Sequence, residues 1–354
     1  MKTITTRVVT ALGGLLLAGA TQAEEGKLYL FNWTAYMDPA IIQAFEDKYD
    51  VEVVQNYFNS LPEMFAKLNT GGASQYDIIV PSNYYVPRLI ETGLVQKLDK
   101  SKIPNFDNIM DQFKNTDYDP GSDYTAAYQY GVTGIVYNTE TFPDAPKSWS
   151  LLFDPKVNAG RPFGLMGDGQ VSMGAACAYL GYGYACTDSE AWKEAAKLLL
   201  DTKQRGNFSG FVDGTPALQQ LARGVTHVSL SYNGDYLYYR EENPESFANI
   251  EFMIPDEGTE IWVDSMMIPS GAPNPELAYK FINFILDPEI GAQLSNYNYY
   301  SSPNAAAKPY LDAVLTKPPV TPSDADLERL SFTPSLQGDK LQMFNQLWTE
   351  VQSR

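Results

Sequence analysis

Apolar residues along the chain occur in short runs that alternate with segments of helical spacing. The runs are of strand length, whereas the segments between them place apolar residues three or four positions apart. In the first hundred residues this pattern predicts strands and helices in alternation, at 28–31, 39–49, 51–57, 62–68, 77–80 and 85–92. Strands that alternate with helices indicate right-handed crossovers and a mainly parallel sheet.

The alternation continues through the rest of the chain. Further strands are predicted at 126–138, 163–166, 225–232 and 261–268. Further helices are predicted at 172–180, 190–200, 215–222, 275–286 and 340–352, with a proline-rich surface connection at 317–322. A length of 354 residues favours two domains. Because no flexible linker separates two halves, we expect an α/β protein whose domains are joined by ordered crossover strands.

Residues 1–23 have the pattern of a secretory signal peptide. Two basic residues precede an apolar run at 8–17, and small residues follow it. We expect cleavage after Ala23, with the motif Ala18-x-Ala20 as a second candidate. The run is too short for a membrane-spanning helix, which needs about 20 apolar residues. No cysteine lies near the cleavage point, so we expect an exported protein without a lipid anchor.

Acidic residues outnumber basic ones. The chain has 43 Asp and Glu against 25 Lys and Arg, a formal net charge of −18. Removal of the signal peptide, with its two basic residues, makes the charge −20. Phosphate recognition needs clustered basic side chains, so this charge argues against a nucleic-acid partner. His227 is the only histidine, which argues against a His-based triad or a zinc site with several histidines, and we expect no metal and no cofactor.

Cys177 and Cys186 are the only cysteines, nine positions apart. In an exported protein such a pair predicts a disulfide. Two buried free thiols are the alternative reading of the same pair.

Polar and aromatic side chains follow the predicted strands, which is where open α/β sheets bind ligands. They are Trp33 and Tyr36 after the first strand, Ser82 and Tyr84 after the third, Asp168 after 163–166, Tyr232 and Asp235 at the end of 225–232, and Trp262 with Asp264 in the late strand. Taken singly, the tryptophans could belong to the core, the tyrosines could pack at a surface, and both aspartates beside glycines could be turn residues. Together they suit an alkyl diammonium ligand, with each ammonium on a carboxylate and the methylenes between rings.

Asp264 stands apart from the other carboxylates because it lies within an apolar strand, where a buried charge needs a partner. Signatures of other chemistries are absent from the sequence, including a phosphate-binding glycine loop and a G-x-S-x-G nucleophile elbow. Paired carboxylates are the groups that glycosidases use, so an exported carboxylate-dependent enzyme remains an alternative.

Several segments, in order along the whole mature chain, resemble the periplasmic polyamine-binding proteins of spermidine/putrescine ABC importers. These segments are 28–36, 76–86, 98–103, 130–138, 262–269 and 302–306. The resemblance implies a type II periplasmic-binding-protein fold, with a ligand cleft between two lobes and no catalysis. We expect one lobe to comprise 24–131 and 264–307, and the other 132–263 and 308–354.

The resemblance also implies ten ligand-binding residues: Trp33, Tyr36, Ser82, Tyr84, Asp168, Tyr232, Asp235, Trp262, Asp264 and Tyr300. The chain departs from the family at three places. Val171 stands where spermidine-type members carry glutamate, Tyr232 replaces a tryptophan, and Leu61-Pro62 replaces Asn-Glu. Asp235 resembles putrescine-type members. These differences leave the choice among putrescine, spermidine, norspermidine and cadaverine open.

The resemblance predicts a monomeric periplasmic protein that captures a polyamine and delivers it to an ABC permease. A second hypothesis is that the same fold reports polyamine to a membrane-bound sensor. Neighbouring permease and ATPase genes, as opposed to a signalling gene, would distinguish the two.

Overall fold

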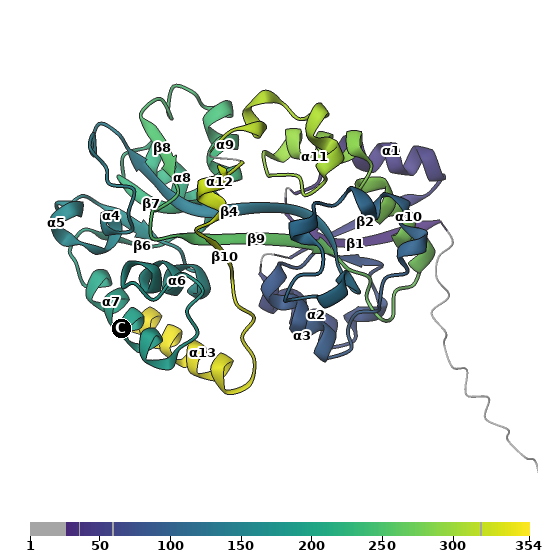
Figure 1. Cartoon of the computed structure of the whole chain (residues 1–354), viewed down its shortest axis with the longest axis horizontal. Coiled ribbons are helices and arrows are strands. Elements are labelled where there is room, and N and C mark those ends of the chain that lie inside the picture. The colour runs from purple at the N-terminus through teal and green to yellow at the C-terminus, as the bar shows by residue number, and fades with distance from the viewer. Residues whose placement is uncertain (1–25, 35, 59, 319–320) are drawn as a thin grey trace, which may run out of the picture.

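Two lobes lie side by side in the computed structural model of the chain (Figure 1). The structure describes residues 26–34, 36–58, 60–318 and 321–354. The signal peptide predicted at 1–23 lies outside the described residues. The long strands β4 (Ala126–Asn138) and β9 (Thr259–Met266) run between the lobes. The predicted two-lobed α/β architecture is therefore confirmed.

The first lobe is built on a parallel sheet with the strand order β2-β1-β3. Its strands are β1 (Lys27–Trp33), β2 (Glu52–Phe58) and β3 (Ile78–Ile79). The helices that follow these strands are α1 (Pro39–Tyr49), α2 (Leu61–Asn69) and α3 (Val86–Glu91). Asp38 begins α1, because its side chain accepts a hydrogen bond from the Ala40 amide and a proline occupies the first turn. The predicted alternation of strands and helices is confirmed here.

The second sheet has seven strands within the described residues, in the order β10-β9-β4-β7-β5-β6, with β8 paired to β4. The strands not yet introduced are β5 (Phe163–Leu165), β6 (Phe208–Phe211), β7 (Val228–Tyr232), β8 (Ile250–Met253) and β10 (Leu330–Phe332). This sheet is mixed, not mainly parallel as the sequence predicts, because β4 runs antiparallel to β7, β8 and β9. Since β4 carries the chain out of the first lobe and β9 carries it back, these neighbouring strands point in opposite directions.

Most helices of the second half cover the second sheet (Figure 1). They are α4 (Ser150–Phe153), α5 (Pro155–Asn158), α6 (Gly169–Tyr179), α7 (Ser189–Lys203), α8 (Gly214–Ala222), α9 (Asn233–Glu242), α12 (Asp324–Leu327) and α13 (Gly338–Ser353). The chain returns to the first lobe in α10 (Pro275–Ile285) and α11 (Pro288–Asn298). The sequence pattern misses α4, α5, α9, α11 and α12; α9 begins at Asn233 and Gly234, residue types that favour turns.

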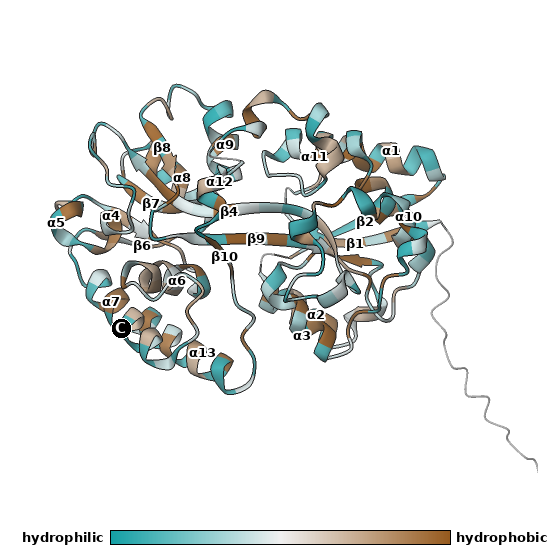
Figure 2. Cartoon of the chain, viewed as in Figure 1, coloured by the Kyte–Doolittle hydropathy of each residue, from teal (hydrophilic) through white to brown (hydrophobic). Residues whose placement is uncertain are grey.

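Buried apolar residues continue along both crossover strands. All residues of β9 and all but the last two of β4 are buried. Leu30 of β1, Val132 of β4 and Val263 of β9 belong to one apolar cluster, and Phe163 belongs to a second cluster that fills the other lobe. Figure 2 shows the apolar colour along β8 and β9 and hydrophilic turns on the outer helix α1. The lobes are thus joined by buried sheet strands.

A disulfide joins Cys177 on α6 to Cys186, and so closes the connection between α6 and α7. Trp192 of α7 packs beside this connection, and its indole Nε1 donates to the Cys186 carbonyl at 3.0 Å. Among the described residues, no helix is long and apolar enough to cross a membrane.

Candidate ligand-binding site

Asp264 of β9 and Ser82 after β3 meet where the first lobe joins the crossover strand. They form an isolated β-bridge, and Ser82 Oγ donates a hydrogen bond to Asp264 Oδ1 at 2.5 Å. The Asp264 side chain is buried, and no basic side chain pairs with it among the described residues. Burial raises the pKa of Asp264 to about 7, against the opposing effect of the Ser82 hydrogen bond. Asp264 is therefore a buried carboxyl group that forms no salt bridge with a basic side chain in the described part of the chain.

Asp168 and Tyr84 make a contact between the two lobes. Asp168 caps α6, with Oδ1 accepting from the amides of Gln170 at 2.8 Å and Val171 at 3.4 Å. Its other oxygen accepts from the Tyr84 hydroxyl at 3.5 Å. Burial raises the pKa of Asp168, and the charge of nearby Asp213 adds to the rise. The helix begins at residue 169, not at 172 as the sequence predicts, because the Asp168 side chain accepts hydrogen bonds from amides of its first turn.

Asp235 lies in the first turn of α9 and is joined to Tyr300, which follows α11. The Tyr300 hydroxyl donates to Asp235 Oδ1 at 2.5 Å. Burial raises the pKa of Asp235, whereas this hydrogen bond lowers it. The carboxylate keeps a second oxygen, which can accept hydrogen bonds from a cationic ligand.

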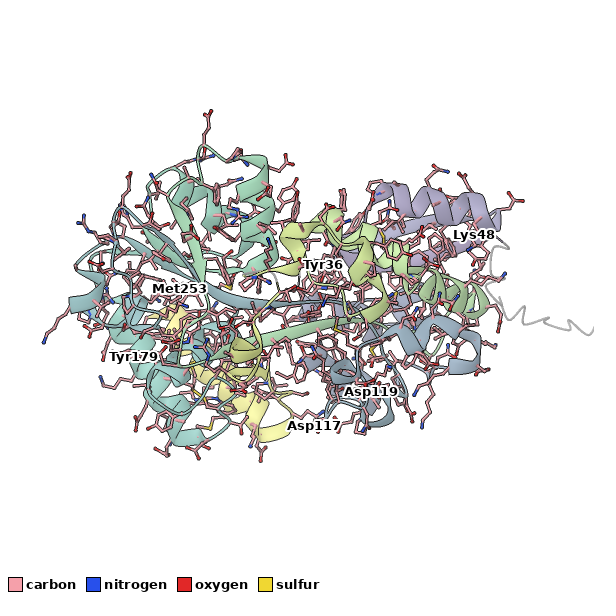
Figure 3. All side chains as sticks on the ribbon, turned by 45° about the horizontal axis from the view of Figure 1, so that its top comes forward. Tyr36, Lys48, Asp117, Asp119, Tyr179 and Met253 are labelled. Carbon is pink, nitrogen blue, oxygen red and sulfur yellow. A yellow bond between two sulfur atoms is a disulfide. The ribbon has the colours of Figure 1, made fainter. Side chains whose placement is uncertain are left out.

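A row of aromatic rings lies between these carboxylates. Trp262 contacts Tyr300 and Tyr232 edge to face, with ring centroids 5.1 Å and 5.8 Å apart. Tyr300 in turn contacts Tyr36 at 5.5 Å. Tyr36 lies between the two lobes in Figure 3. Ring faces at this position can attract a cation and pack against methylene groups.

The structure links nine of the ten predicted residues through hydrogen bonds, ring contacts or electrostatic interactions. The tenth, Trp33, packs on Phe58 of β2 with ring centroids 4.5 Å apart. Its indole Nε1 is buried and has no hydrogen-bond partner within the described part of the chain. Trp33 also packs against the apolar cluster to which Tyr36, Trp262 and Tyr300 belong.

Two glycines leave room for the rings. Gly131 on β4 lies opposite Trp262 on β9. A Cβ atom at Gly131 would lie 2.4 Å from Trp262 Cζ2, and one at Gly234 would lie 2.4 Å from Tyr300 Cδ1. Both distances are far below van der Waals contact, so both rings depend on a glycine beneath them.

We expect Gly131→Ala to lower the free energy of unfolding by about 1–3 kcal/mol, because the added methyl group must displace the Trp262 ring. Urea denaturation followed by tryptophan fluorescence measures both the stability and the changed environment of the ring. Gly206→Ala is the matched control, since a Cβ atom there meets nothing within 4 Å. An unchanged midpoint for Gly131→Ala would contradict the expectation.

Glu260 is a buried carboxylate that the sequence reasoning missed. It alternates with Trp262 and Asp264 along β9, so the three side chains share one face of the sheet. Its oxygens accept hydrogen bonds from the hydroxyls of Thr133 and Thr333. Burial raises the pKa of Glu260 to about 7, against these hydrogen bonds. The sequence does contain a signal for Glu260: it lies two positions before Trp262, so in a strand both side chains point to the same face of the sheet.

The ligand-free protein is expected to lose stability as the pH rises from 5 to 7. The pKa of Asp264 is about 7 in the folded chain against 3.8 for an ordinary aspartate, so the folded state keeps a proton that the unfolded chain releases in this window. Each such group lowers the free energy of unfolding by about 1 kcal/mol per pH unit. Urea denaturation across this range measures the slope, which Asp264→Asn should reduce. An equal slope in that variant would show that Asp264 is not the titrating group.

Within the described ranges, no group of three or more His, Cys, Asp or Glu side chains is placed to hold a metal ion. The arrangement can instead hold an organic cation, because separate carboxylates surround a row of rings.

Residues 40–322 match the family model described as Bacterial extracellular solute-binding protein. The chain belongs to this family. Among the relatives of this solute-binding protein is the putrescine/cadaverine-binding protein of Pseudomonas aeruginosa, 34% identical over 350 residues, which cover 96% of this chain and 97% of the relative. The spermidine/putrescine-binding periplasmic protein of Salmonella typhimurium is 32% identical over 312 residues, which cover 86% of each chain.

Solved structures agree with this assignment. The solute-binding protein superposes on the Tp0655 lipoprotein of Treponema pallidum with a TM-score of 0.82 and 33% identity, over 93% of this chain and all of the other. A putative spermidine/putrescine ABC transporter structure from Listeria monocytogenes gives a TM-score of 0.83 and 30% identity, over 93% and 99% of the two chains. The predicted periplasmic-binding-protein fold is thereby confirmed.

Proposed function

We propose that this solute-binding protein captures a polyamine between its lobes and delivers it to an ABC permease. One observation carries the proposal: Asp168, Asp235 and Asp264 surround a row of aromatic rings, and no basic side chain forms a salt bridge with any of them in the described part of the chain. Relatives named for binding putrescine, cadaverine and spermidine support the same ligand class.

The chemistry of a polyamine complements the site. Each ammonium group donates several hydrogen bonds and carries the positive charge that a buried carboxylate lacks. The alkyl segments between ammonium groups are apolar and pack on ring faces such as those of Trp262 and Tyr300. The proposed role is therefore to hold and deliver the ligand without a reaction on it, in keeping with the solute-binding family to which the chain belongs.

Ligand binding is proposed to stabilise the closed arrangement of the lobes. The lobes comprise 24–131 with 264–307, and 132–263 with 308–354. Tyr84 and Asp168 come from different lobes and already contact each other. A ligand that touches both lobes binds the closed form better than the open form, and this difference in affinity shifts the equilibrium. The signal peptide at 1–23 directs the protein to the periplasm, where a closed monomer docks on the permease.

A thermal-shift panel tests the proposed ligand class. Putrescine, cadaverine, norspermidine, spermidine and spermine are each added to the purified protein. A ligand that binds only the folded state raises the unfolding temperature, and at a hundred times its Kd it adds about 2.7 kcal/mol of stability. Butane-1,4-diol is the uncharged control for putrescine. No shift with any amine, or an equal shift with the diol, would contradict the proposal.

A further inference from the structure

Glu260 faces the side of the sheet that carries the candidate site. It is followed at intervals of two residues by Trp262 and Asp264, which places all three on one face of β9. Residues of the neighbouring strands lie on the same face. Thr133 of β4 donates a hydrogen bond to Glu260 and is paired in register with Tyr232 of β7. Tyr232 contacts Trp262 at 5.8 Å. A row of side chains across three strands therefore connects Glu260 to the aromatic rings.

The charge of Glu260 is not compensated by the protein. The side chain is 3% exposed, and no salt bridge involves it among the described residues. Its hydrogen-bond donors are two neutral threonine hydroxyls, which leave other lone pairs of the carboxylate unused. The charge of Asp168 helps to raise the pKa of Glu260, and the charge of Glu260 helps to raise the pKa of Tyr84 in the other lobe. A buried carboxylate beside a second carboxylate is costly unless a cation joins them.

The spacing of the carboxylates along β9 defines a length. Asp264 lies four residue steps beyond Glu260, which places their Cα atoms about 13 Å apart along a strand. The nitrogens of a four-carbon diamine are about 6 Å apart, whereas the terminal nitrogens of a triamine with three- or four-carbon segments are about 10–11 Å apart. With a hydrogen bond of about 2.8 Å at each end, a triamine reaches about 16 Å and a diamine about 12 Å, so only the triamine exceeds the spacing of the two residues along the strand.

We propose that Glu260, beside Asp168, receives one terminal ammonium of a triamine while Asp264 receives the other, so that this cleft distinguishes triamines from diamines. The proposal rests on the proposed function and adds a residue that determines ligand length. Trp262 lies between the two carboxylates, so its ring lies along the alkyl chain. Thr133 and Thr333 hold the Glu260 carboxylate in place and act as positioning residues.

Isothermal titration of Glu260→Gln with norspermidine and putrescine tests the proposal. The variant keeps the size of the side chain and one acceptor oxygen but removes the charge. We expect norspermidine affinity to fall about thirtyfold and putrescine affinity to change less than about twofold. Glu257→Gln is the matched control, because Glu257 accepts a hydroxyl hydrogen bond from Ser148 elsewhere in the second lobe; both affinities should be retained.

The outcomes are distinguishable. If norspermidine and putrescine lose affinity equally in Glu260→Gln, Glu260 supports the fold and does not read ligand length. If norspermidine affinity is retained, Glu260 does not contact the ligand. Either result overturns the proposal. If wild-type protein binds no amine of any length, the proposed function itself fails. Should Glu260→Gln not fold, Thr333→Val removes one of the two hydroxyls that hold the carboxylate and should weaken norspermidine binding alone, by about threefold to tenfold. Equal losses for both amines in that variant would likewise overturn the proposal.

Discussion

Asp264→Asn is expected to weaken polyamine binding by about a hundredfold or more. The variant keeps the shape of the side chain and the hydrogen bond from Ser82, but it removes the charge that faces the ligand. Removing one partner of a buried, hydrogen-bonded charge pair costs about 2–5 kcal/mol, because the other charge stays buried without compensation. Isothermal titration with the amine that gives the largest thermal shift measures this loss.

Asp77→Asn is the matched control for this prediction. Asp77 is also a buried aspartate, but its oxygens accept hydrogen bonds from the amides of Tyr29 and Asn274 in the first lobe. Its substitution should lower stability and leave polyamine affinity unchanged. Unchanged affinity in Asp264→Asn, with the control behaving as expected, would remove Asp264 from the site.

Trp262→Ala is expected to reduce polyamine affinity by about thirtyfold to a hundredfold. The indole provides the ring face for the ligand and also holds the rings of Tyr232 and Tyr300 by edge contacts. Desolvated cation–π contacts contribute about 2 kcal/mol or more, and central aromatic residues dominate many binding sites. The same titration measures the loss, and circular dichroism verifies that the variant is folded, since truncating a buried tryptophan costs about 3–5 kcal/mol of stability.

Trp262→Phe distinguishes the contribution of the aromatic ring face from that of the indole N–H group, because it keeps a ring and removes the N–H. Trp262 Nε1 is buried and has no hydrogen-bond partner among the described residues, so losing the N–H group leaves no acceptor unsatisfied. We expect this variant to retain affinity within about tenfold. If alanine and phenylalanine give the same affinity, the ring face does not contact the ligand.

Much of the first lobe could be predicted from the sequence because its strands and helices are local patterns. The strand pattern at 28–31 and the proline-opened helix at 39–49 correspond closely to β1 and α1. The helix α9 could not be predicted in the same way. Its first residues, Asn233 and Gly234, favour turns in isolation, and the helix forms where it packs against β4, β7, α8 and α11.

The rule that ligands lie beyond the ends of strands predicted which residues belong to the candidate site. It did not predict which of these residues form hydrogen bonds with each other. Ser82 and Asp264 are 182 positions apart, and Tyr84 and Asp168 are 84 positions apart. Local periodicity carries no information about contacts at such separations. Glu260 was missed because it directly precedes the strand predicted at 261–268, where a glutamate has the pattern of an exposed connection; the observed strand begins earlier, at Thr259.

The sequence by itself determined the class of the protein: alternating strands and helices require an α/β sheet, and clustered rings with excess carboxylates indicate an organic cation. The tertiary structure alone decided that the second sheet is mixed, because β4 and β9 cross between the lobes in opposite directions. It also decided which of the described carboxylates are buried without a salt bridge, because burial and pairing depend on segments distant in the chain. For Asp264 and Glu260, that burial raises both pKa values to about 7.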